Sequence, residues 1–293
     1  MNTFHQPVFY MAKIEIIITG YFYADGGAMF GAIPKSAWSH KYPSNPDNGC
    51  VLAMKSLLIS SSSGRKILVD TGCGYKHLKQ LSYYHFFGLK DLRMALAGAG
   101  TQPEEITDVV LTHLHFDHCG FCTYAQEDGL RMAFPNANHW VSRRQWDNFC
   151  HPNALEKDSF FDEDMRLVSE TGKLSLVETN LRLTPDVNLS LCDGHTPGQI
   201  VPFVETDNGQ VVFAGDVIPL ISNVSPAWIS AYDVEPLCSY EEKSRLLELA
   251  AQENLRIIYC HDAYFCSSQI VKTDSGLFLP ARNSIIKEGK LPL

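Results

Sequence analysis

Short apolar runs, separated by polar or glycine-containing turns, recur along the chain and predict a mixed α/β scaffold. Two pairs of runs have the form of β-hairpins: residues 56–61 with 66–70, which turn at Gly64, and residues 199–206 with 210–214, which turn at Asn208-Gly209. Single strands are expected at residues 13–21, 107–112, 137–142 and 256–260.

Helical patterns occupy several of the intervening segments, at residues 89–96, 144–149 and 158–171. A further helix is expected to begin at Ser239, because Ser239 and Glu242 have the spacing of a capping box ahead of an apolar face. The stretch 146–180 has the least regular pattern, and we predict that it is a lid or an insertion.

Several of the predicted strands end just before a histidine or an aspartate. His113, His195, Asp216 and His261 all have this position. Because strand ends on an α/β scaffold are common places for functional side chains, we expect these residues to form one site. Since the site draws on residues as far apart as 113 and 261, we predict a single domain over 11–293, preceded by a loose extension at 1–10.

Composition narrows the classes of partner. The 293 residues are 45% hydrophobic, which is enough for a full core, and 24 Lys+Arg against 33 Asp+Glu give a net charge of −9. This acidity argues against nucleic acid and against an anionic membrane surface as partners. The nine cysteines are scattered and odd in number, and no signal peptide or membrane span is recognisable, so a cytoplasmic location is expected.

The segment from Thr112 to Gly120 carries the strongest chemical signal. It contains four candidate metal ligands within six residues: His113, His115, Asp117 and His118. Imidazole nitrogens and carboxylate oxygens suit zinc and similar transition metals. With His195, Asp216 and His261 the candidates number seven, which is too many for one tetrahedral zinc and favours two metals that share a carboxylate.

These motifs, HLHFDH at 113–118, GHTPG at 194–198, the aspartate at 216 and the His261-Asp262 pair, resemble the metallo-β-lactamase superfamily. The resemblance covers about residues 14–265 and includes the LVDTG segment with Asp70. It is closest to the lactonase and methyl parathion hydrolase-like branch, in which the segment DGGAMFGAIPK at 25–35 also looks familiar.

The resemblance implies an α+β fold, the four-layer αβ/βα sandwich, with the site at one edge between the sheets. It implies that His113, His115 and His195 bind one metal, that Asp117, His118 and His261 bind the second, and that Asp216 bridges them. Two Zn²⁺ are expected, with Fe, Mn or Co as alternatives. A metal-bridging hydroxide would be the nucleophile, Asp117 would carry a proton to the leaving group, and Asp70 would orient a ligand histidine.

The expected reaction is hydrolysis of a lactone or another carboxylic ester, with N-acyl homoserine lactones as one candidate. Lactonases of this branch place a tyrosine three residues after the bridging aspartate, whereas this chain has Pro219, so Tyr232, Tyr23 or Tyr264 would have to replace it. Candidate pocket residues are apolar or aromatic: Met29, Phe30, Phe116, Trp228 and Tyr232.

Other functions on the same motifs stay open. They are a phosphotriester or phosphodiester hydrolase for small molecules, a mono-iron thiol-ester or oxygenase enzyme, and a non-catalytic metal-binding protein. A homodimer is compatible with the sequence. We interpret Cys119 and Cys122 as structural, because neither a second CxxC pair nor a thioredoxin-type context is present, and His139 as a structural strand residue.

Overall fold

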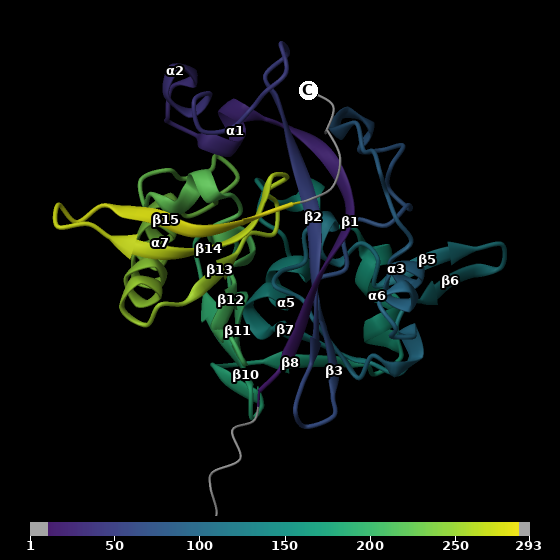
Figure 1. The fold of residues 1–293 in the computed structure, drawn as a ribbon. Helices are drawn as coiled ribbons and strands as arrows, with labels where there is room; N and C mark the ends of the chain where they lie inside the picture. Colours follow the sequence, from purple (N-terminus) through teal and green to yellow (C-terminus); the bar gives the residue numbers. More distant parts are fainter. Residues whose placement is uncertain (1–10, 287–293) are drawn as a thin grey trace, which may run out of the picture.

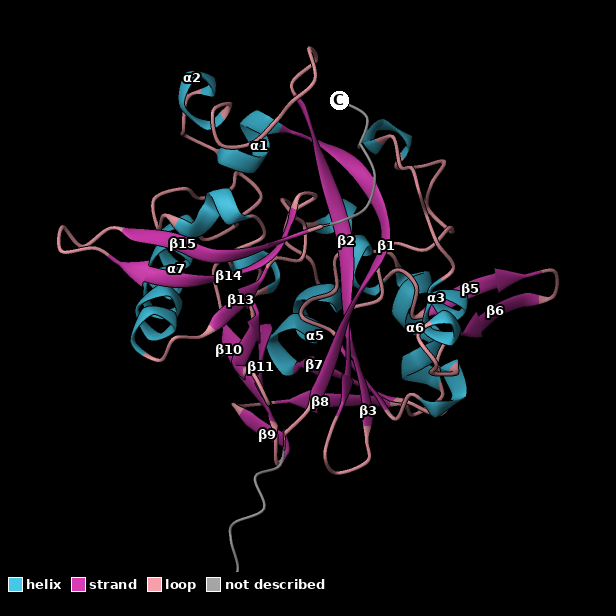
Figure 2. Cartoon of the chain, viewed as in Figure 1, coloured by secondary structure: helices cyan, strands magenta, loops and turns pink. Residues whose placement is uncertain are grey.

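The structure is a computed structural model that describes residues 11–286, so the predicted extension at 1–10 lies outside the described residues. Two sheets face each other, with helices on the outer sides (Figures 1 and 2). The first sheet has six strands, in the order β1 (Lys13–Asp25), β2 (Gly49–Ser60), β3 (Lys66–Val69), β4 (Asp108–Val110), β7 (Asn138–Ser142) and β8 (Leu174–Val177).

The second sheet has seven strands. In spatial order they are β15 (Phe278–Ile285), β14 (Phe265–Lys272), β13 (Arg256–Ile258), β12 (Gly209–Phe213), β11 (Gln199–Thr206), β10 (Val187–Cys192) and β9 (Leu181–Thr184). A small hairpin, β5 (Thr123–Gln126) with β6 (Gly129–Met132), projects from the molecule (Figure 1).

The helices complete the outer layers. They are α1 (Gly26–Phe30), α2 (Lys35–Trp38), α3 (Leu92–Gly98), α4 (Phe116–Cys119), α5 (Arg143–Cys150), α6 (Asp162–Glu170) and α7 (Pro236–Gln252). Figure 2 shows α3 and α6 on one side of the molecule and α7 on the opposite side. Among residues 11–286, no helix has both the length and the apolar character that crossing a membrane requires.

Three clusters of buried side chains correspond to the interfaces between four layers. Val69 and Val110 of the first sheet pack with Val211 and Phe213 of the second, so the two sheets meet face to face. The outer face of the first sheet packs on α3 and α6, and the outer face of the second packs on α7. Removal of this apolar surface from water is the main term that stabilises the sandwich.

Both predicted hairpins are present, but the second turns at Asp207-Asn208, one residue before the predicted Asn208-Gly209, because Gly209 pairs with Thr206. Strands β2 and β3 pair antiparallel from Leu57 opposite Val69 to Ser60 opposite Lys66, and β11 and β12 pair from Phe203 opposite Val212 to Thr206 opposite Gly209. Gly64, in the first turn, has a φ of 85°, a conformation that glycine adopts without steric cost.

The predicted start of the last helix is wrong. Helix α7 begins at Pro236, with Glu235 as its N-cap residue, and Ser239 lies inside the helix, so it does not cap it. The rigid φ of proline suits the first helical position, which lets the helix begin three residues before the capping-box pattern. Helix α3 likewise begins only at Leu92, because the side chain of Asp91 accepts a hydrogen bond from the Arg93 amide and caps it.

The stretch 146–180 contains regular structure. It includes the end of α5, helix α6 and strand β8, which pairs with β7 at the edge of the first sheet. Residues 151–161, between α5 and α6, contain only a short 3₁₀ turn at Lys157–Ser159 and lead from one helix to the other.

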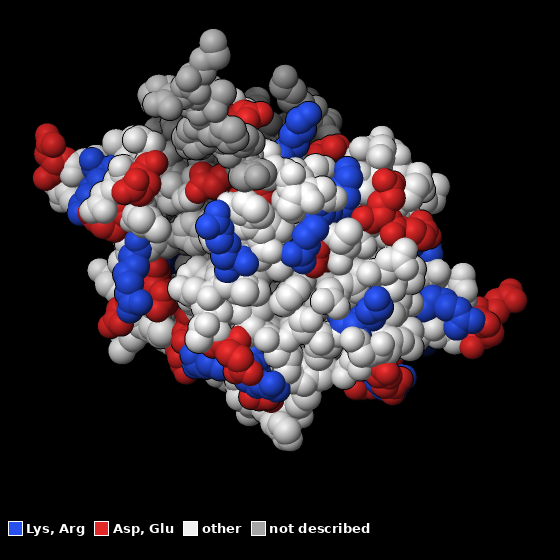
Figure 3. Space-filling view, turned by 90° about the horizontal axis from the view of Figure 1, so that it is seen from below, with Lys and Arg blue, Asp and Glu red and all other residues white. Residues whose placement is uncertain are grey.

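On the face shown in Figure 3, basic and acidic side chains alternate over the surface without a continuous patch of either sign.

Candidate metal centre

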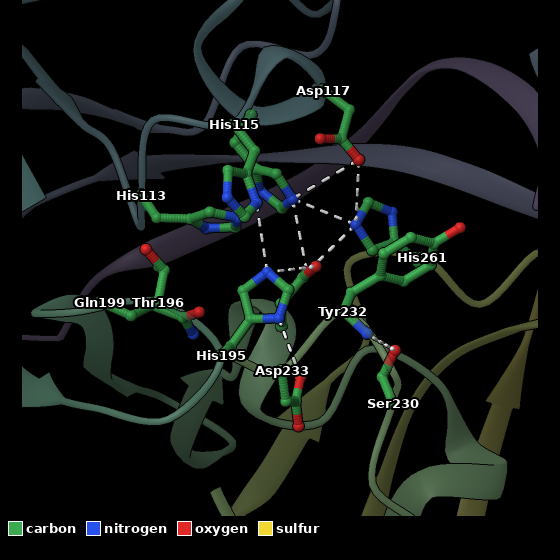
Figure 4. A network of polar contacts seen from close by, with 12 residues as sticks. His113, His115, Asp117, His195, Thr196, Gln199, Ser230, Tyr232, Asp233 and His261 are labelled. Carbon is green, nitrogen blue, oxygen red and sulfur yellow. Dashed lines mark hydrogen bonds and ion pairs between the residues drawn. The ribbon is translucent and has the colours of Figure 1, made fainter. Parts of the chain in front are cut away.

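The sequence-predicted ligands meet where strands of both sheets end. His113 and His115 follow β4, and Asp117 and His118 lie in the single turn of α4. His195 follows β10, Asp216 follows β12, and His261 follows β13, so distant parts of the chain converge on one point (Figure 4).

Close backbone contacts shape the HLHFDH segment. A Cβ atom on Gly120 would lie 2.3 Å from the Phe116 carbonyl oxygen and 2.4 Å from the Cys73 carbonyl oxygen, so only glycine fits there. The Thr71 amide donates to the His118 carbonyl at 2.7 Å, which ties α4 to the end of β3. The ligands are therefore carried by a backbone that packing holds on two sides.

Asp216 lies between two groups of ligands. Its Oδ1 is 3.4 Å from His118 Nε2 and 3.1 Å from His261 Nε2, whereas its Oδ2 is 3.3 Å from His195 Nε2. The two oxygens thus contact different groups of candidate ligands, an arrangement that suits a carboxylate bridging two cations.

Ligand atoms close enough to share a cation form groups that match the predicted sets. One group is His113, His115 and His195, and another is Asp117, His118 and His261, with the ligand atoms of each group within 4.8 Å of one another. Two further groups contain Asp216, one of them together with Cys260, whose Sγ is 3.1 Å from Asp216 Oδ1.

Each of the five histidines has its second ring nitrogen beside an oxygen. These pairs are His113 Nδ1 with Thr112 Oγ1 (3.1 Å), His115 Nε2 with Glu156 Oε1 (3.1 Å), His118 Nδ1 with Asp70 Oδ2 (2.8 Å), His195 Nδ1 with Asp233 Oδ1 (2.9 Å) and His261 Nδ1 with the Ala53 carbonyl (2.8 Å). A neutral imidazole that donates its one proton to such an oxygen presents the lone pair of its other nitrogen to the centre.

Of these oxygen partners, only Asp70 was among the sequence-predicted site residues. Its carboxylate also accepts from the amide and the hydroxyl of Thr112, each at 2.8 Å. Asp233 and Glu156 were missed, and no local pattern marks them, because each meets its histidine only through the tertiary fold.

The centre favours positive charge. Burial alone would lower the pKa of His261, but Asp216 and then Asp117 raise it to about 9. Burial would likewise raise the pKa of Asp216, yet His261, His118 and His195 hold it well below its usual range. By contrast, burial lowers the pKa of His113 well below its normal value, so this ring stays neutral. The metal-free centre therefore holds protonated imidazole beside its carboxylates, and a cation that binds there must displace the proton of His261, since a ligand nitrogen needs a free lone pair.

An orphaned atom tests whether the residues fit a metal. His113 Nε2 is buried and has no hydrogen-bond partner among residues 11–286, while its Nδ1 faces Thr112. A buried nitrogen without a partner is costly unless something else binds its lone pair. Three histidines around such an atom are a ligand set that zinc accepts, so the residues fit the metal that the motifs imply.

A cavity of about 170 Å³ adjoins the centre, and Asp117, His195, Asp216 and His261 form part of its wall. Most of the remaining wall is apolar, with contributions from Phe22, Ala24, Met29, Leu52, Phe116, Leu155, Pro219 and Val234. The predicted pocket residues Met29, Phe116 and Tyr232 line this cavity.

Phe30 and Trp228 are not part of the cavity wall. Phe30 is fully buried and stacks on Trp38, with its edge toward Trp228 at 5.8 Å between ring centroids. These rings pack behind Met29 as core, because the short helix α1 turns Phe30 away from the cavity.

Among the tyrosines considered as replacements at Pro219, only Tyr232 lines the cavity. Tyr23 packs on His85 and Phe87, and Tyr264 packs on Tyr42 at 5.2 Å. In the view of Figure 4, the Tyr232 ring lies beside His261 and its hydroxyl points away from the histidines. Tyr84 also lines the cavity, and its hydroxyl influences the pKa of Tyr232.

Parts of the chain are similar to proteins of known family. Residues 55–125 match the model of the metallo-beta-lactamase superfamily. An N-acyl homoserine lactonase of Bacillus thuringiensis is 25% identical over 168 residues, which are 57% of this chain and 60% of that protein. The chain therefore spans about 60% of the length of the curated relatives it matches.

Solved structures resemble nearly the whole chain. A probable metal-dependent hydrolase from Staphylococcus aureus has a TM-score of 0.86 and 27% identity, covering 95% of this chain and 98% of that one. AidC, described as a dizinc quorum-quenching lactonase, has a TM-score of 0.74 and 20% identity over 97% of each chain. The predicted four-layer fold is confirmed, and residues 55–125 match the metallo-beta-lactamase superfamily.

Proposed function

We propose that the protein is a two-metal hydrolase that opens a lactone or cleaves another carboxylic ester. The observation that carries the proposal is the position of Asp216, whose two oxygens face two separate groups of ligands beside a largely apolar cavity. The similarity to an N-acyl homoserine lactonase and to a dizinc quorum-quenching lactonase supports the same chemistry and makes N-acyl homoserine lactones the first candidate substrates.

In this proposal, His113, His115 and His195 hold one Zn²⁺, and Asp117, His118 and His261 hold the other, with Asp216 shared between them. When bound, the metals supply Lewis-acid activation of water and of the scissile carbonyl. The carboxylates Asp70 and Asp233 and the Ala53 carbonyl keep the ligand rings in one orientation and one tautomer.

Asp117 is the proposed carrier of a proton to the leaving group. Its Oδ2 is 3.4 Å from His261 Nε2, and the residue also lines the cavity. A carboxylate in contact with both the ligand cluster and the substrate space can accept a proton from water and pass it to the departing alkoxide.

The cavity wall is proposed to bind the acyl part of the substrate. Met29, Leu52 and Phe116 offer apolar contacts, and the Tyr232 hydroxyl, which points away from the histidines in Figure 4, suits a polar group of the acyl chain. Pro219 carries no hydroxyl that could donate to the scissile carbonyl, so bound metals would have to supply its polarisation.

The test is metal analysis followed by a substrate panel. Purified protein is expected to contain about two zinc ions per chain and to hydrolyse at least one N-acyl homoserine lactone, other lactone or aryl ester. His115→Ala should remove this activity, while His151→Ala, a change at an exposed histidine, should preserve it. Metal-loaded protein that is inert on all these substrates contradicts the proposal. Turnover of phosphotriesters alone, or a single bound iron, would assign the site to one of the other classes.

A further inference from the structure

Glu156 lies outside every motif that led to the metal centre, yet its carboxylate is buried against one of the ligands. It belongs to the segment between α5 and α6, its residue is 3% exposed, and its Oε1 is 3.1 Å from His115 Nε2. A buried carboxylate is costly unless hydrogen bonds compensate for its lost hydration, so its partners indicate what it does.

The side chains recorded in hydrogen bonds with Glu156 among the described residues can all act as donors to it. Asn148 Nδ2 donates to Oε2 at 3.0 Å, and Asn153 Nδ2 donates to the same oxygen. Asn153 Oδ1 in turn accepts from the amides of Leu155 and Glu156, at 2.9 and 3.1 Å. The short segment is therefore folded around an acceptor-only group at position 156, a requirement that a carboxylate satisfies and an amide does not.

The consequence for His115 concerns its tautomer. With Oε1 as an acceptor, the ring proton lies on Nε2, and the lone pair of Nδ1 is free. His115 Nδ1 is 3.3 Å from His195 Nε2, on the side of the three-histidine group. The opposite tautomer would direct a proton into that group, where a ligand nitrogen needs a lone pair.

The same carboxylate is connected to a second ligand segment. Asn148 Nδ2 also lies 3.3 Å from Thr196 Oγ1, and Gln145 Nε2 donates to this hydroxyl at 2.8 Å. Thr196 directly follows His195, so α5, which carries Gln145 and Asn148, supports two of the three histidines through one polar network. No residue of this network contributes a ligand in the proposed scheme.

We propose that Glu156 is a positioning residue that keeps His115 in the tautomer with a free Nδ1 and thereby sets the metal affinity of the three-histidine position. The inference rests on the proposed two-metal function. The inference assigns these two carboxylates to different metal positions. Asp70 contacts His118 of one ligand set, whereas Glu156 contacts His115 of the other.

The test compares zinc affinities of the wild-type protein, Glu156→Ala and Glu156→Gln by competition with a chelator. Loss of a carboxylate that orients a ligand histidine lowers metal affinity by about 10–100-fold. We expect a loss of this size for one of the two zinc ions in Glu156→Ala, and a smaller loss for the same ion in the nearly isosteric Glu156→Gln. Glu170→Ala, at an exposed position in α6, is the matched control and should bind both ions normally.

The melting temperature of each variant in excess chelator separates positioning from a purely structural role. A structural role lowers the melting temperature without a change in zinc affinity, and that result overturns the inference. If Glu156→Ala does not fold, Glu156→Gln decides the matter by the same criterion. Wild-type protein that fails to bind two zinc ions refutes the proposed function itself, whereas two tightly bound ions in the wild type and in both folded variants refute only the role of Glu156.

Discussion

Acid should destabilise the protein through a histidine that takes no part in the proposed metal centre. His139 lies in β7 opposite Val109 of β4, and its side chain is fully buried. By the two-residue period of a strand it shares a face with Val141, which packs with Met165 and Val168 of α6. Burial in this apolar layer lowers the pKa of His139 to about 4, against 6.5 for an exposed histidine.

The direction in which stability changes with pH follows from proton binding. Between pH 6.5 and pH 4, the unfolded chain takes up a proton at this position and the folded protein does not, so stability falls as the pH is lowered. The difference between the two pKa values, at about 1.4 kcal/mol for each tenfold change in proton affinity, corresponds to about 3 kcal/mol. About 2 kcal/mol of this should be lost by pH 5.

The assay is urea unfolding of the metal-free protein at pH 7 and pH 5, for the wild type and for His139→Gln. The substitution changes absolute stability, but only the difference between the two pH values matters, and it should be about 2 kcal/mol smaller in the variant. His151→Gln, at an exposed histidine, should behave as the wild type. An equal loss in His139→Gln and in the wild type would refute the reasoning.

Three further changes have distinct expected results. Asp70→Asn should lower the affinity for one zinc ion by about 10–100-fold in chelator competition, since Asp70 Oδ2 is 2.8 Å from His118 Nδ1. The control Asp274→Asn, at an exposed position, should leave zinc affinity unchanged. Normal zinc binding by Asp70→Asn would contradict the prediction. Tyr232→Phe should raise the KM for a hydrolysed ester several-fold with little change in kcat, because its hydroxyl faces away from the histidines in Figure 4. The control Tyr264→Phe should change neither KM nor kcat. A fall in kcat alone for Tyr232→Phe would argue against a role in substrate binding. Gly120→Ala should cost about 1–3 kcal/mol and lower the melting temperature by several degrees, because its Cβ would meet two carbonyl oxygens; an unchanged melting temperature would show that the backbone yields.

The convergence of the candidate ligands could be predicted because its signals are local. Four candidates lie within the six residues 113–118, and the others each follow a short apolar run, so strand ends brought them to the same place. The hairpins were equally accessible, since each joins two apolar runs through a short polar turn that contains or adjoins a glycine: residues 61–65 in the first, and Asp207-Asn208 next to Gly209 in the second.

The supporting residues could not be found in this way. Asp233 and Glu156 are 38 and 41 residues from the histidines they contact. The sequence around each of them looks the same as the sequence around an ordinary carboxylate at the surface. Apolar residues present a similar difficulty, because Met29 and Phe30 are neighbours in sequence and only the direction of a five-residue helix decides which one faces the cavity. Two local patterns predicted different starts for the last helix, a capping box at Ser239 and a proline at 236, and the helix begins at the proline.

The cavity has a consequence for how this protein can evolve. Met29, Tyr84, Leu155 and Tyr232 enter its wall from four segments that contribute no metal ligand in the proposed scheme, and two of them, Leu155 and Tyr232, are 78% and 40% exposed. Substitutions at such exposed positions have small effects on folding. In the proposed hydrolase, single mutations in these segments can therefore change which substrate is bound, while the strand ends that carry the candidate metal ligands stay unchanged.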